Sequence, residues 1–308
     1  MSYTDRVKDE LVRYENRSYE EQLAELAALI RMNGSIQISE RHLAVKIKIY
    51  HGNLARRIFS LIKERFGFNI EIIVRQNRKF NRKHSYELIL TPQPGIREFL
   101  LELGFLNPKN NLIFRIKEEY LKNRKLAQAY LRGIFLGGGS INSPKSEYHL
   151  EFRCERSSLS DDLIDLLKKF ELNPHQTEHK ENYVIYFKNY EEIVKILNII
   201  GAHKALLDME NIQIVKQVKN DVNRKVNFET ANLEKTVSAA TDQLENIKLI
   251  ENKKGLNVLS RSLKEIAELR KENPYASLKE LGEKLDLSKS GVNHRFRRLK
   301  KLADEIRG

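Results

Sequence analysis

An internal repeat limits the folds that this chain can adopt. Residues 26–34 read LAALIRMNG, and residues 131–139 read LRGIFLGGG, 105 positions further along. Each segment ends a predicted helix and leads directly into strand-like alternation. The same order of helix, two strands, helix and two strands follows in both places. The repeat therefore predicts two pseudo-symmetric αββαββ halves, at about 19–105 and 116–201, within a domain that covers residues 1–215.

The helix of each repeat carries small residues one turn apart. These are Ala24 and Ala28 in the first half and Gly133 and Gly137 in the second. Glycine inside a helix costs about 1 kcal/mol relative to alanine, so its presence needs a reason. We expect the two helix backbones to approach closely at a pseudo-twofold axis. In the second half, a single long helix is expected over 116–136.

The segment after the repeats changes in character. Residues 219–232 (KNDVNRKVNFETAN) have weak hydrophobic periodicity and are interpreted as a linker. A helix with an apolar face from Leu233 to Ile247 follows, so that 216–257 forms a linker and connecting helix. Residues 258–308 are predicted to form a separate domain of three short helices. The predicted fold class is α+β, with a duplicated αββαββ domain followed by an all-α domain.

The three C-terminal helices are predicted to form a helix-turn-helix. Residues 277–280 (SLKE) are a capping box at the start of the second helix. Asp286 occupies the turn, where it tolerates a left-handed backbone, and Ser288 caps the third helix. Gly282 lies ten residues before Val292, a spacing that lets the second and third helices cross closely.

The third helix is strongly basic. From Ser288 to Lys301 the sequence has six Lys or Arg and no acidic residue. In a helix-turn-helix the start of this helix enters the major groove, and basic residues hold the phosphates. The predicted DNA-binding residues are Ser277, Ser288, Lys289, Ser290, Asn293, His294, Arg295, Arg297, Arg298, Lys300 and Lys301. The alternative is a basic helical bundle that docks on a protein.

A second basic segment lies between two predicted strands of the first half. Residues 75–84 (RQNRKFNRKH) carry five Lys or Arg and no acid, which predicts a hairpin tip that contacts phosphates. Two lysines on one face of a neighbouring strand are added to this segment. The second candidate DNA contact therefore consists of Lys46, Lys48, Arg75, Arg78, Lys79, Arg82 and Lys83. A solvated turn is the alternative. The matching strand of the second half carries Glu151 beside Arg153 and is less suited to DNA.

Composition restricts the class of protein further. The formal net charge of +13 is compatible with a nucleic-acid partner. The single cysteine, Cys154, excludes an internal disulfide and a Cys-rich zinc site. No apolar stretch reaches the roughly 18 residues of a membrane helix, and the opening MSYTDRVKDE is unlike a signal peptide. We therefore expect a cytoplasmic protein with no membrane association.

The two repeats resemble the paired nine-residue motifs of the LAGLIDADG homing endonucleases. In that family each motif ends in Asp-Gly, and the two carboxylates bind divalent metal ions at the scissile phosphates. Here Asn33 and Gly138 occupy the acid positions. Neither replaces an anionic oxygen ligand of a hard cation, and two-metal cleavage needs that ligand charge. The resemblance therefore implies the scaffold without catalysis, and we expect no metal and no cofactor.

The whole chain resembles the WhiA family of bacterial regulators. The segments that carry this resemblance are SYTDRVKDEL, IRMNGSI, LGGGSI, NRKVNFETANLEKT and LSKSGVNHRFRRL, within residues 1–306. It implies a degenerate homing-endonuclease domain, a C-terminal helix-turn-helix, and sequence-specific binding of double-stranded DNA at the nucleoid. It also implies a role in cell division and chromosome segregation, or in the control of sporulation genes in spore-forming relatives.

Two other functions remain open from the residues. A divergent endonuclease would recruit metal through other acids and would nick plasmid DNA with Mg²⁺. A protein-interaction scaffold would bind RNA polymerase or a division protein. We expect no small-molecule substrate for this chain. If the chain is such a scaffold, replacing Arg297 and Arg298 by alanine should change its affinity for DNA little. If it is a DNA-binding regulator, the same substitutions should lower that affinity markedly.

Overall fold

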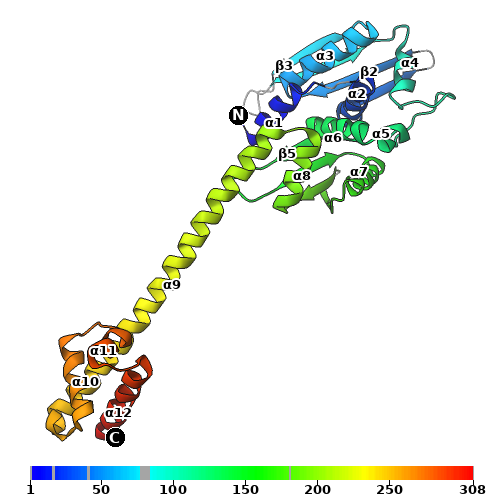
Figure 1. The fold of residues 1–308 in the computed structure, drawn as a ribbon. Coiled ribbons are helices and arrows are strands. Elements are labelled where there is room, and N and C mark those ends of the chain that lie inside the picture. Colours follow the sequence, from blue (N-terminus) through cyan, green and yellow to red (C-terminus); the bar gives the residue numbers. More distant parts are fainter. Residues whose placement is uncertain (1, 16–17, 40–41, 77–83, 180–181, 308) are drawn as a thin grey trace. The chain divides into compact units, whose positions relative to one another are not determined.

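The chain folds into two compact units, Met1–Val215 and Lys216–Gly308, each with its own hydrophobic core. The structure is a computed structural model (Figure 1). It describes residues 2–15, 18–39, 42–76, 84–179 and 182–307.

The first half of the first unit alternates helices with pairs of strands. Its elements are α1 (Tyr3–Val12), α2 (Tyr19–Asn33), β1 (Gly34–Ser39), β2 (His42–Ile49), α3 (Gly52–Phe66), β3 (Glu71–Gln76), β4 (His84–Leu90) and α4 (Ile96–Glu102). The hydroxyl of Ser18 accepts from the Glu21 amide and so caps α2. Gly67, with φ of 67°, ends α3 in the left-handed conformation that glycine adopts readily.

The second half repeats this order. Its elements are α5 (Glu118–Lys122), α6 (Arg124–Gly138), β5 (Gly139–Ile141), β6 (Leu150–Cys154), α7 (Ser157–Lys169), β7 (His175–His179), β8 (Asn182–Phe187) and α8 (Tyr190–Ile200). The single long helix expected over 116–136 is wrong, because the backbone is extended at Asn123. The Asn123 side chain accepts from the Lys125 amide and starts α6 as a new helix.

The two antiparallel sheets have the same topology, which confirms the duplication. Their strand orders are β1-β2-β4-β3 and β5-β6-β8-β7. On β2, Val45, Ile47 and Ile49 are buried, whereas Lys46 and Lys48 point to the opposite face. The alternation read from the sequence is therefore the alternation between the core and the outer face of the sheet.

The helices α2 and α6 pack against each other at the centre of the first unit (Figure 1). A Cβ placed on Gly133 would lie 2.5 Å from the carbonyl oxygen of Glu25 and 2.7 Å from the Cβ of Ala28. Only glycine allows this approach, which confirms the close contact expected between the two repeat helices.

A single helix, α9 (His203–Lys254), runs through the segment interpreted as a linker. The interpretation of 219–232 as a linker that precedes a separate helix is therefore wrong. Residues 203–254 contain neither glycine nor proline, so nothing in the local sequence interrupts the helix. Every side chain from 219 to 232 is exposed, which explains why this part shows no apolar stripe. The helix ends at Lys254, where Gly255 follows with a φ of 73°.

The second unit is a small helical bundle. After α9 and a short 3-10 turn (Leu256–Val258), it consists of α10 (Arg261–Glu272), α11 (Leu278–Leu285) and α12 (Lys289–Arg307). Its buried core includes Ile247, Ile266, Leu281, Val292 and Leu299. Among the described residues of both units, no helix combines the length and the apolar character needed to cross a membrane.

Candidate nucleic-acid interface

The turn between α11 and α12 has the features of a helix-turn-helix. The Ser277 hydroxyl accepts from the Glu280 amide, and the Glu280 carboxylate accepts from the Ser277 amide, which confirms the capping box. Hydrogen bonds to the Glu280 carboxylate from the backbone amide and from the hydroxyl of Ser277 hold the pKa of Glu280 below its ordinary value. Asp286 is left-handed, with φ of 51°. A Cβ on Gly282 would lie 2.5 Å from the Leu287 carbonyl oxygen, so the chain can turn tightly only with glycine there.

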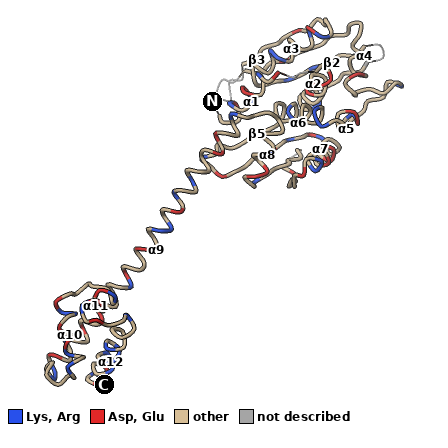
Figure 2. Tube along the Cα trace, viewed as in Figure 1, with Lys and Arg blue, Asp and Glu red and all other residues tan. Residues whose placement is uncertain are grey.

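The first turn of α12 is exposed and fixed by its own cap. Ser288 Oγ accepts from the Gly291 amide at 3.2 Å and lies 3.1 Å from Ser290 Oγ. Of the residues predicted to bind DNA, the exposed ones are Ser288, Lys289, Ser290, His294, Arg297, Arg298, Lys300 and Lys301. Asn293 is half-buried. These side chains therefore form one basic surface on α12, whose Lys and Arg positions can be followed in Figure 2.

Two predicted residues already have structural contacts within the unit. Ser277 is engaged in the capping box of α11. Arg295 is only 22% exposed, donates to the Ser262 carbonyl oxygen at 3.1 Å, and lies 3.8 Å from Glu265. This guanidinium holds α12 against α10, so the main role of Arg295 is in packing within the unit.

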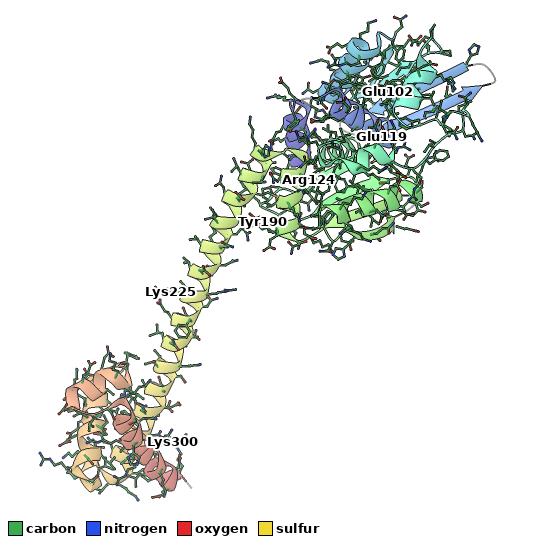
Figure 3. The ribbon with its side chains drawn as sticks, turned by 45° about the vertical axis from the view of Figure 1, so that its right-hand side comes forward. Glu102, Glu119, Arg124, Tyr190, Lys225 and Lys300 are labelled. Carbon is green, nitrogen blue, oxygen red and sulfur yellow. The ribbon has the colours of Figure 1, made fainter. Side chains whose placement is uncertain are left out.

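One side of the α12 surface borders a groove of about 300 Å³ against α9. Asn293, Arg297 and Lys300 line it from α12, and Lys300 is labelled in Figure 3. Asp242 and Glu245 line it from α9. The basic surface therefore has an acidic border on this side, and Lys289, Arg298 and Lys301 do not line this groove.

Arg270 is a structural residue of this unit that the sequence pattern did not reveal. Its side chain is 1% exposed and lies at the centre of the unit. Its Nη1 donates to the carbonyl oxygens of Asn273, Pro274 and Ala276, and its Nε donates to Gln243. Burial lowers the pKa of this guanidinium. Arg270 thus holds the α10–α11 turn, and the only sequence signal for it was a basic residue on the apolar face of α10.

Two basic residues of the second candidate contact lie beside the carboxylate of Glu87. Lys46 Nζ lies 2.9 Å from Glu87 Oε2, and an Arg75 nitrogen lies 3.6 Å from the same oxygen. The hydrogen bond from Lys46 and the nearby charge of Arg75 hold the pKa of Glu87 below its ordinary value. Lys48 lies opposite Glu87 in the pairing of β2 with β4, its charge also lowers the pKa of Glu87, and its ammonium group lies over the ring of Tyr50. The other four predicted residues, Arg78, Lys79, Arg82 and Lys83, lie outside the described residues.

The two acid positions of the repeats carry no carboxylate, and both lie in close contacts between elements. Asn33 Nδ2 donates to the Gly137 carbonyl oxygen at 3.3 Å, so this amide bridges the two repeat helices. A Cβ on Gly138 would collide with the Met32 methyl group and would lie 2.8 Å from the Arg153 carbonyl oxygen. Within the described ranges, no group of three or more His, Cys, Asp or Glu side chains is placed to bind a metal ion.

Three family descriptions match successive parts of the chain. "WhiA N-terminal LAGLIDADG-like domain" matches residues 19–106, "WhiA LAGLIDADG-like domain" matches 127–219, and "WhiA C-terminal HTH domain" matches 222–303. The chain is similar over its full length to proteins named "Probable cell division protein WhiA". That of Halothermothrix orenii is 58% identical, and that of Alkaliphilus metalliredigens is 45% identical; in both comparisons 100% of this chain and 99% of the relative are covered.

A solved structure agrees with these sequence matches. The full-length DUF199/WhiA crystal structure from "Thermatoga maritima" is 27% identical, covers 99% of both chains and has a TM-score of 0.64. The matches to the three descriptions, together with the full-length relatives, establish that this chain belongs to the WhiA family.

Proposed function

We propose that this protein is a non-catalytic regulator that binds specific sequences in double-stranded DNA through α12. One observation carries the proposal. The exposed surface of α12 from Ser288 to Lys301 contains basic and small polar side chains and no acid, and it begins at a capped helix start. Such a helix start fits the major groove, where Lys289, Asn293 and His294 would contact base edges.

The remaining basic residues supply affinity that is independent of sequence. Arg297, Arg298, Lys300 and Lys301 lie further along α12 and would contact the phosphate backbone. Ser277 and Arg295 support this surface from the structural positions described above. The relatives are named as probable cell division proteins, and on that basis the regulation by this chain would act in cell division.

Binding of RNA polymerase or of a division protein is the second candidate function. The observation that favours it is the pairing of Lys46 and Arg75 with Glu87, because it removes positive charge from a sheet that would otherwise grip DNA. In this case the first unit binds a protein, while α12 still binds DNA.

A titration of the full chain with fragments selected from the genomic DNA of its host tests the proposal. Replacing Arg297 and Arg298 by alanine removes two phosphate contacts. We expect a loss of affinity, and a plot of log K against log[salt] that is shallower by about 2. The matched control replaces Lys253 and Arg261, two exposed basic residues of the same unit outside α11 and α12. DNA binding that is equally affected by both pairs of substitutions, or by neither, would contradict the proposal.

The same samples test for catalysis. Incubation of supercoiled plasmid with the protein and Mg²⁺ should leave the plasmid intact, because Asn33 and Gly138 supply no carboxylate. Mg²⁺-dependent nicking that co-purifies with the full chain would instead support the divergent endonuclease.

A further inference from the structure

The edge strand β3 of the first sheet exposes apolar side chains. β3 is the last strand in the order β1-β2-β4-β3, and all six of its residues are exposed. Ile72, Ile73 and Val74 are 48%, 37% and 54% exposed. An edge strand offers unpaired backbone groups to another strand, and proteins usually protect such edges with polar or charged residues. β3 lacks this protection at its centre.

The fold itself does not require an apolar edge at this place. The strand β7 occupies the same position in the second sheet, at the end of the order β5-β6-β8-β7. Its sequence, HQTEH at 175–179, is polar throughout, and its five residues are also exposed. The two halves thus provide an internal comparison, in which only the first half has an apolar edge strand.

The sequence of β3 is complementary to itself when read in the opposite direction. Antiparallel pairing about a twofold axis at Ile73 places Glu71 opposite Arg75 of the second copy, and Ile72 opposite Val74. Glu71, Ile73 and Arg75 alternate on one face, since they pair with Ile89, Glu87 and Ser85 of β4. Each dimer would therefore contain two cross-strand ion pairs that flank an apolar centre on this face.

We propose that β3 is a self-association site, where two copies of this chain pair edge to edge and join their sheets. The charges of Glu71 and Arg75 favour a second copy of this strand as the partner, and they define the register of the pairing. Glu71 makes no ion pair with another described residue, so its carboxylate is available to a second copy. Arg75 lies 3.6 Å from Glu87 but is 64% exposed, so its guanidinium can contact Glu71 of a second copy as well as Glu87. A shift by two residues in either direction would remove both ion pairs. The interface is isologous, so it closes at a dimer and does not extend into a fibre.

A charge exchange on the full chain, without DNA, tests the partner and the register. Sedimentation velocity at protein concentrations from about 1 to 100 µM covers the dissociation constants expected for so small an interface. Glu71→Arg places two arginines opposite each other, and we expect self-association about tenfold weaker. The double variant Glu71→Arg/Arg75→Glu restores opposite charges and should recover association. A monomer over the whole range, or association that Glu71→Arg leaves unchanged, would overturn the proposal.

A cysteine at the axis tests the same register independently. Across a twofold axis the two Cα atoms of residue 73 would lie about 4.5–5.5 Å apart, within the range of a disulfide. Ile73→Cys should therefore form a covalent dimer under mild oxidation, whereas Val74→Cys, one residue off the axis, should not. The native Cys154 is 2% exposed and does not compete. Equal cross-linking of the two variants would show random encounters and would refute the register. Neither test depends on DNA binding, so failure here leaves the proposed function untouched.

Discussion

Nε of Arg132 donates to Oε2 of Glu25 at 2.9 Å across the interface of α2 and α6, and both side chains are buried. Glu25 also accepts from Arg57 of α3 at 2.9 Å, and Arg132 donates to the Ile200 carbonyl oxygen at the end of α8. Arg132 corresponds to Ala27 in the first repeat. The two halves are thus joined by a buried charge pair that the repeat pattern does not contain.

Removing the carboxylate of this pair should destabilise the first unit strongly. Glu25→Gln removes the carboxylate that accepts from both Arg132 and Arg57, and we expect the free energy of unfolding to fall by about 3–5 kcal/mol. Urea unfolding followed by circular dichroism measures it. Glu171→Gln is the control, because its pair with Lys195 is exposed and should contribute less than about 1 kcal/mol. Equal effects of the two substitutions would show that the buried pair is unimportant.

Two glycine-to-alanine substitutions should change stability in opposite directions. In Gly133→Ala the new Cβ would lie 2.5 Å from the Glu25 carbonyl oxygen, and we expect the free energy of unfolding to fall by about 1–3 kcal/mol. In Gly291→Ala the nearest atom to the new Cβ is Ser288 Oγ at 3.5 Å, which leaves room for it. The better helix propensity of alanine should therefore raise the free energy of unfolding by as much as about 1 kcal/mol. Thermal unfolding of both variants provides the measurement. A stabilised Gly133→Ala protein would contradict the close packing of α2 and α6.

Restoring the acids of the repeats should not create a nuclease. The variant Asn33→Asp/Gly138→Asp has both carboxylates, but position 138 has no room for a side chain between Met32 and the Arg153 carbonyl. We expect no plasmid nicking with Mg²⁺ or Mn²⁺, together with a lower melting temperature. Asn33→Asp alone, which only replaces an amide, is the control for the melting temperature. Cleavage by the double variant would show that the neighbouring backbone moves aside.

The second unit should lose stability in acid through Glu280. Its pKa is lower in the folded state than the ordinary value of 4.5, because the Ser277 amide and hydroxyl hydrogen-bond to the carboxylate. The stabilisation is therefore present above about pH 4.5 and is lost as the pH falls through the folded-state pKa. Thermal unfolding of the full chain at a series of pH values below 5 measures this loss. Glu280→Gln should flatten the dependence for the second unit, and an unchanged slope would argue against the capping box as its source.

The elements that follow local rules could be predicted from the sequence. The capping box at Ser277, the left-handed Asp286 and the end of α9 before Gly255 depend on residues that are neighbours in the chain. The duplicated sheets follow from alternation within each strand. Such features need no knowledge of what packs against them.

The features that depend on distant contacts could not be predicted. The Arg270 side chain is buried because its donors meet three carbonyl oxygens of the following turn and Gln243 of α9. Arg295 looked like a phosphate contact until α10 placed Ser262 beside it. The helix across 219–232 has no apolar face to reveal it, so the absence of helix breakers was the only signal.

The crowding around Gly138 also has an evolutionary consequence. Every codon change that replaces this glycine adds a Cβ against Met32 and the Arg153 carbonyl. In a lineage that starts from this chain, an acid at this position would displace the Met32 side chain and the Arg153 carbonyl of β6. The single mutation that introduces a carboxylate here would therefore lower stability, and selection for a stable fold would oppose it.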